Sequence, residues 1–245
     1  MMIHTVILVA VLCTSMLSGV LGMAGGMILM AILVAVLPVA TAMMLHGAVQ
    51  AFSNGSRAWF LREHIRWNIL PWYLVGSAVA VGAFALLTLV PDPGVVLILV
   101  GAMPWIARAT PRIAANLDVS RPVTGVICGV TVTIAQLLAG ASGPLLDLFY
   151  QHSPLNRHQV VASKALTQTV GHLLKLAYYG ALAGSIGALP VWFYVVAILT
   201  AVAGARIGTR LLDRLADDHF RRVSGWVILG LGLVSMIAGV RQLVG

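Results

Sequence analysis

Long apolar stretches separated by short polar connections run along the whole chain. A hydrocarbon core of about 30 Å needs roughly 20 apolar residues for each helical crossing, and several stretches approach or exceed that length. The stretches are 5–21, 27–45, 68–90, 94–107, 122–150, 176–205 and 223–240. They are too many and too long for one soluble core. The pattern predicts an all-α integral membrane protein.

Two of these stretches are interrupted by glycine clusters that lie 118 residues apart. The matched positions are Gly22, Gly25 and Gly26 in the first cluster and Gly140, Gly143 and Pro144 in the second. A continuous helix over 5–37 would be about 50 Å long at 1.5 Å per residue, well beyond the hydrocarbon core. We therefore expect each cluster to break a helix into a hairpin, 5–20 with 27–37 and 122–138 with 144–151.

The helix expected after each break carries one polar stripe on an otherwise apolar surface. The stripes are His46, Gln50, Asn54 and Arg57, and then Lys164, Gln168, His172 and Lys175. Both have the spacing 4, 4, 3, so each set lies within about 80° of helix surface at 100° per residue. A cation at the membrane centre costs about 2.5 to 3.5 kcal/mol, which a bound anion would offset. Alternatively, Arg57 lies near its helix end and extends to the interface.

The distribution of positive charge predicts how the two halves are oriented. The bases cluster in three connections, at Arg62 and Arg66, at Arg108, Arg112 and Arg121, and at Arg206, Arg210, Arg214, Arg221 and Arg222. The connection around 182–189, which corresponds to the first cluster, has no charge. If all three clusters are cytoplasmic, the second half is inserted upside down relative to the first. Each half then crosses the membrane an odd number of times, and both termini lie outside.

This predicts one transmembrane domain made of two inverted-topology repeats, 1–115 and 116–245. Each repeat is a glycine-broken helix hairpin followed by about three transmembrane helices.

Composition excludes several classes of function. Only 9% of the residues are charged, against roughly a quarter in soluble domains. The net charge of +8 comes from bases in short connections, which topology explains better than a nucleic-acid partner. Cys13 and Cys128 lack metal-ligand spacing, and no Ser/His/Asp set, HExxH or phosphate-binding loop is present. We therefore expect neither an enzyme nor a metal or other cofactor.

The breaks and stripes together predict an anion site at the membrane midplane. The first amides of a helix lack intrahelical partners, and the positive end of the helix dipole points the same way. The predicted hydrogen-bond donors are the amides of Gly25, Gly26 and Gly143 with the Ser142 hydroxyl; Gln50, Asn54, Gln168 and His172 orient the anion; Arg57 and Lys175 supply charge. The alternative is that the glycines only permit close helix packing.

Three residues are candidates for proton coupling. Asp147 is the carboxylate within a predicted membrane element, and it either pairs with Lys164 or Lys175 or relays a proton. His46 and His172 are the others, since imidazole titrates near physiological pH.

The glycine-broken first helix, the break at 140–144, the polar helix through Lys175 and the closing stretch from Gly204 and Gly208 to Arg222 resemble the TauE/SafE sulfite exporter family. The resemblance covers nearly the whole chain. It implies movement of sulfur-containing anions, such as sulfite or organosulfonates, across the inner membrane. The first break departs from the expected longer glycine run, and methionines crowd it, which points to a changed cavity and substrate.

We therefore predict a multi-pass protein of the bacterial inner membrane that exports small sulfur-containing oxyanions by alternating access, with proton coupling as an option. The alternatives are an anion channel and a transporter of another small carboxylate or oxyanion. The expected partners are the anion and the lipid bilayer. Monomer and homodimer both stay open, because the Gly204/Gly208 and Gly230/Gly232 spacings permit packing within or between chains.

Overall fold

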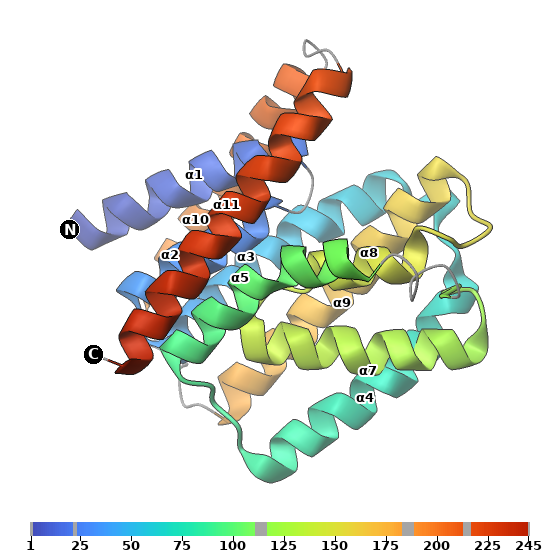
Figure 1. Cartoon of the computed structure of the whole chain (residues 1–245), viewed down its shortest axis with the longest axis horizontal. Helices are drawn as coiled ribbons and strands as arrows, with labels where there is room; N and C mark the ends of the chain where they lie inside the picture. Colours follow the sequence, from blue (N-terminus) through green and yellow to red (C-terminus); the bar gives the residue numbers. More distant parts are fainter. Residues whose placement is uncertain (1, 22–23, 111–116, 183–188, 213–216, 245) are drawn as a thin grey trace.

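The computed structural model describes residues 2–21, 24–110, 117–182, 189–212 and 217–244 (Figure 1). Within these residues the regular elements are ten α-helices and two short 3-10 turns. The predicted all-α fold is confirmed for the described part of the chain.

The two halves of the chain contain the same order of helices. The first half has α1 (Met2–Leu21), α2 (Ala24–Val36), α3 (Val39–Phe60), α4 (Leu70–Leu87) and α5 (Pro93–Ala109), with 3-10 turns at Arg62–His64 and Trp67–Ile69. The second half has α7 (Pro122–Ala139), α8 (Gly143–Tyr150), α9 (Arg157–Leu182), α10 (Val191–Leu212) and α11 (Asp217–Val244). In each half, a helix and a shorter helix precede three longer ones.

The second break lies where the glycine cluster predicts it, between α7 and α8. Gly140 ends α7 with a φ of 73°, a left-handed conformation that glycine adopts without a Cβ penalty. A Cβ there would also lie 2.8 Å from the sulfur of Met43. Of the first break, Gly22 and Met23 lie outside the described residues.

Proline marks the points at which two of the apolar stretches divide into separate helices. The stretch 27–45 contains the end of α2 and the start of α3, because Pro38 precedes α3 and cannot donate a helical hydrogen bond. The stretch 176–205 likewise contains the end of α9 and most of α10, which begins after Pro190.

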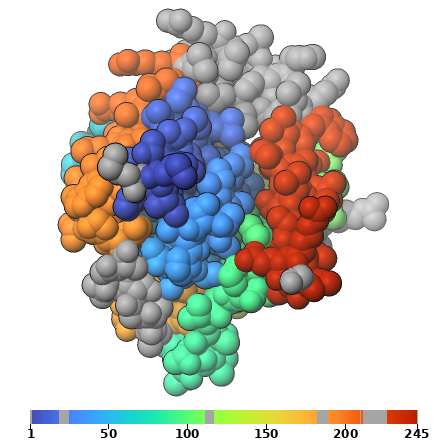
Figure 2. All heavy atoms as spheres, turned by 90° about the vertical axis from the view of Figure 1, so that its left-hand side faces the viewer, coloured from blue at the N-terminus to red at the C-terminus, as the bar shows by residue number. Residues whose placement is uncertain are grey.

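The most extensive helix contacts join one half of the chain to the other. Helix α1 lies along α10, α4 along α7, α3 along α9, and α5 along α11. Figure 2 shows α10 beside α1 on the face where both termini lie. The halves are therefore interlocked through these four pairs.

Glycine lets the backbones touch at these crossings. A Cβ on Gly129 of α7 would overlap the carbonyl oxygen of Tyr73 on α4, and one on Gly101 of α5 would overlap that of Gly232 on α11. Gly204 and Gly208 of α10 face α1 in the same way, close to the carbonyl oxygens of Leu12 and Met16. Packing within the chain therefore accounts for the Gly204/Gly208 spacing and for Gly232.

Four described helices are long and apolar enough to cross a membrane: Trp67–Leu87, Pro122–Ala139, Val191–Gly208 and Trp226–Val244. Met2–Ser18, Gly25–Val36 and Pro93–Ala109 are shorter apolar helices. Helices α3 and α9, 22 and 26 residues long, belong to neither group because their polar stripes lower their apolar content.

Replacing Gly129 by alanine is expected to lower the melting temperature of the detergent-purified protein by several degrees. The added methyl group cannot fit against the α4 backbone, and overpacking costs about 1–3 kcal/mol. The matched control is Gly82→Ala on α4, where a Cβ meets nothing within 4 Å. Equal melting temperatures for the two variants would contradict backbone contact at this crossing.

Candidate functional site

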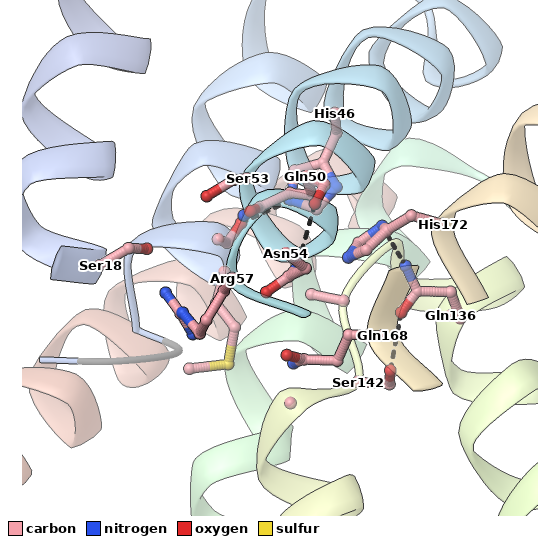
Figure 3. A pocket seen from close by; sticks show the side chains of 14 residues that line it. Ser18, His46, Gln50, Ser53, Asn54, Arg57, Gln136, Ser142, Gln168 and His172 are labelled. Carbon is pink, nitrogen blue, oxygen red and sulfur yellow. Dashed lines mark hydrogen bonds between the residues drawn. The ribbon is translucent and has the colours of Figure 1, made fainter. Parts of the chain in front are cut away.

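A small pocket lies beside the second break, between α3 and α9 (Figure 3). Its lining comes from both halves of the chain: Ser18, Gly26, Met27, His46, Gln50, Ser53, Asn54, Arg57, Gln136, Ala141, Ser142, Gly143, Gln168 and His172. Its free volume is about 30 Å³, room for about two or three water molecules. This lining contains no carboxylate.

Helices α3 and α9 bring the two polar stripes face to face. They run antiparallel, since Gly47 lies near Leu176 while Gly55 lies near Thr169. The start of α9 is fixed by a reciprocal cap: the Gln159 amide nitrogen donates to Asn156 Oδ1, and the Asn156 amide nitrogen donates to Gln159 Oε1. From the two helices, Asn54 and Gln168 point toward one another in Figure 3.

A hydrogen-bond network at the second break fixes the orientation of His172. Gln136 Nε2 lies 3.3 Å from the carbonyl oxygen of Gly140, which can only accept, and Ser142 Oγ donates to Gln136 Oε1 over 2.7 Å. The same Nε2 is 2.7 Å from His172 Nδ1, so this ring nitrogen is the acceptor. A neutral His172 therefore carries its proton on Nε2, which has no hydrogen bond among the described residues.

A second hydrogen-bond network connects α2, the helix after the first break, to Gly140 at the second break. His46 Nε2 donates to the Gly26 carbonyl oxygen over 2.8 Å, since a carbonyl cannot donate. His46 Nδ1 is then free to accept from Lys175 Nζ, 2.8 Å away. Lys175 Nζ also donates to the Gly140 carbonyl oxygen over 2.8 Å. Hydrogen bonds thus run from Gly26 through His46 and Lys175 to Gly140.

Lys175 is completely buried, with a relative exposure of 0%. Its two hydrogen-bond partners are a ring nitrogen and a carbonyl oxygen, and no carboxylate pairs with it in the described part of the chain. It lies behind His46 and does not line the pocket. Burying a positive charge without an opposite charge beside it is unfavourable in free energy.

Arg57 lines the pocket, and its guanidinium makes no hydrogen bond or ion pair with the residues that the structure describes. Asp147, in contrast, pairs with Lys164 across α8 and α9. Of the two partners considered for Asp147, the structure selects Lys164, and neither residue lines the pocket. The described pocket is therefore electropositive at its Arg57 end.

Eight of the ten predicted substrate-binding residues line this pocket: Gly26, Gln50, Asn54, Arg57, Ser142, Gly143, Gln168 and His172. The other two are Lys175 and Gly25. Gly25 faces α1, where a Cβ would overlap the Thr14 carbonyl oxygen and Ser18 Oγ, and it does not line the pocket. Binding by the eight stays a prediction.

The sequence reasoning did not identify Ser18, Ser53 or Gln136 as lining residues. A signal for two of them was present, because Ser18 and Gln136 are themselves 118 residues apart, the offset that relates the two breaks. Gln136 is also a lone amide in apolar sequence, four residues before Gly140.

Comparison with known proteins gives one family. A sequence model of the sulfite exporter TauE/SafE family matches residues 7–235. No curated protein and no solved structure matches the chain. The match covers both breaks, both polar stripes and every residue that lines the pocket. The chain therefore belongs to the sulfite exporter TauE/SafE family.

Proposed function

We propose that the protein is a secondary transporter that exports small sulfur-containing oxyanions, such as sulfite or organosulfonates, across the bacterial inner membrane. The observation that carries the proposal is the described pocket lining, which combines amide and hydroxyl groups, a histidine and an arginine that no described residue pairs with, and which contains no carboxylate. Such a lining attracts an anion, and its described residues include no negative charge that would repel one. Membership of the sulfite exporter family supports this class of substrate.

Several donors meet at the pocket. His172 Nε2 carries a proton in the neutral ring, Arg57 supplies charge, and the amide groups of Gln50 and Gln168 can turn either end toward a ligand. The first amides of α8, beginning at Gly143, have no partner within the helix. The small free volume suits an anion of few atoms.

Alternating access follows from an inverted arrangement of 1–115 and 116–245. The repeated helix order, the common end of both termini in Figure 1 and the antiparallel central pair support it. So do the reciprocal pairs, α1 with α10 and α7 with α4. Because these pairs mix the halves, the moving units are the hairpin α1–α2 with α10 and the hairpin α7–α8 with α4.

Proton coupling is assigned to His46 with Lys175. Their 2.8 Å contact requires one donor and one acceptor. His46 Nδ1 can take up a proton only if Lys175 Nζ loses one and becomes the acceptor, because two donors that face each other repel. The titratable neighbour is His172, whose ring centre is 5.4 Å from that of His46. Asp147 is already paired with Lys164.

Asn54→Leu and Gln168→Leu should each reduce sulfite efflux by at least about tenfold, because each removes a polar group that faces the pocket; a lost hydrogen bond to a charged ligand costs about 1.5–3 kcal/mol. The measurement is initial flux of labelled sulfite from proteoliposomes containing only purified protein. Phe52→Leu and Leu173→Ala, exposed positions on the same two helices, are the controls and should keep wild-type flux.

Wild-type flux from both polar variants would contradict this site. Flux that rises linearly with sulfite concentration, without saturation, would identify an anion channel instead. Preferential competition by carboxylates over sulfonates would assign the pocket to another anion class.

Lys175→Arg is expected to remove the response of transport to an imposed pH gradient. Arginine keeps the positive charge and the hydrogen-bond donors but does not release its proton near neutral pH. Wild-type flux should change when a pH gradient is imposed, whereas the variant should transport at a rate that the gradient does not alter. A variant that keeps the wild-type response would exclude Lys175 from coupling. Thermal unfolding with and without sulfite shows that the variant is folded and still binds.

A further inference from the structure

We infer that the protein has a second oxyanion site, in a vestibule between α3 and α10 that adjoins the central pocket. The inference rests on the proposed function for the identity of the anion. The vestibule has a free volume of about 520 Å³, and its basic residues are Arg57, Arg206 and Arg210. Acidic residues are absent from its described lining.

The vestibule and the central pocket share two residues. Ser53 and Arg57 of α3 line both cavities, so the Arg57 side chain lies at the boundary between them. An anion that moves from one cavity to the other therefore passes the Arg57 guanidinium. This places the vestibule on a path between the pocket and the surface.

The helix geometry of α10 directs its arginines into this vestibule. Gly204 and Gly208 pack against α1, and Arg206 lies two residues beyond Gly204, about 200° around the helix. Arg206 and Arg210 are four residues apart and share one face. That face is turned from α1 and toward α3.

Within the part of the chain that the structure describes, these arginines form no ion pair. The ion pairs of the described residues are Arg121 with Asp118 and Lys164 with Asp147. Arg57, Arg206 and Arg210 line one cavity, so an anion bound there would be attracted to all three guanidinium groups.

The chemistry of the lining indicates the class of ligand. Guanidinium groups bind oxyanions through paired N–H donors. Phe60, Leu61 and Val202 add apolar surface beside them. The vestibule thus suits sulfite and also a sulfonate with a short apolar group. A positive cavity also raises the local anion concentration, in a manner that salt screens.

The test is sulfite transport by the double variant Arg206→Gln/Arg210→Gln in proteoliposomes made of neutral lipid. We expect the KM for sulfite to rise about three- to tenfold, with an unchanged maximal rate and a weaker dependence of KM on ionic strength. The control, Arg121→Gln/Arg241→Gln, removes the same charge from exposed positions outside the vestibule and should keep the wild-type KM. An unchanged KM in the Arg206/Arg210 variant would overturn the inference.

Two further arms separate the possible failures. The cavity holds a lipid phosphate instead of a free anion only if two results occur together. Adding phosphatidylglycerol to the neutral lipid would change the transport rate of the wild-type protein, and the double variant in neutral lipid would keep the wild-type KM. Those two results would also overturn the inference. If the wild-type protein transports no sulfite, the proposed function fails. Calorimetric binding of methanesulfonate then tests the vestibule alone. The Arg206→Gln/Arg210→Gln variant should weaken this binding at least threefold, and Arg121→Gln/Arg241→Gln should leave it unchanged; unchanged binding to the Arg206/Arg210 variant would overturn the inference.

Discussion

The hydrogen bonds of the buried Lys175 amino group are the interactions on which the rest of the structure depends. This amino group joins the Gly140 carbonyl oxygen at one helix break to His46, which in turn holds the Gly26 carbonyl oxygen beside the other. Two of these contacts join a carbonyl oxygen at a helix break to a side chain of α3 or α9, and the third joins the two side chains to each other. The contacts can therefore form together only when both breaks and both polar helices are in place. The network therefore fixes the relative position of the two halves at their centre, with no carboxylate partner for Lys175 among the described residues.

The pocket acquires its character from this arrangement. Protein donors already occupy the nearby acceptors: Lys175 and Gln136 donate to the Gly140 carbonyl oxygen, and Gln136 also donates to His172 Nδ1. His172 Nε2 and the Arg57 guanidinium keep N–H groups without protein partners in the described structure. The result is a cavity that offers mainly donors and positive charge. Packing through glycine, as at Gly129 and Gly101, brings the backbones of the surrounding helices into contact.

Sequence periodicity predicted the all-helical fold, the second break and most of the pocket residues, because glycine clusters and polar stripes are rare in apolar helices. It could not predict how each helix is rotated about its axis. Gly25 and Gly26 are adjacent, so their faces differ by about 100°, and one packs on α1 while the other lines the pocket. Lys175 shares a stripe with His172 but reaches His46 instead of the cavity. Such assignments depend on the partner helix, as does the interlocking of the halves.

The central claim is that one anion site is built jointly by α3 and α9. Calorimetric titration of the purified wild-type protein, Arg57→Gln and His172→Phe with sulfite tests it most directly, because each substitution removes a donor from a different helix. The account predicts saturable binding to the wild-type protein and at least about tenfold weaker binding to both variants. Wild-type affinity in both variants would contradict it.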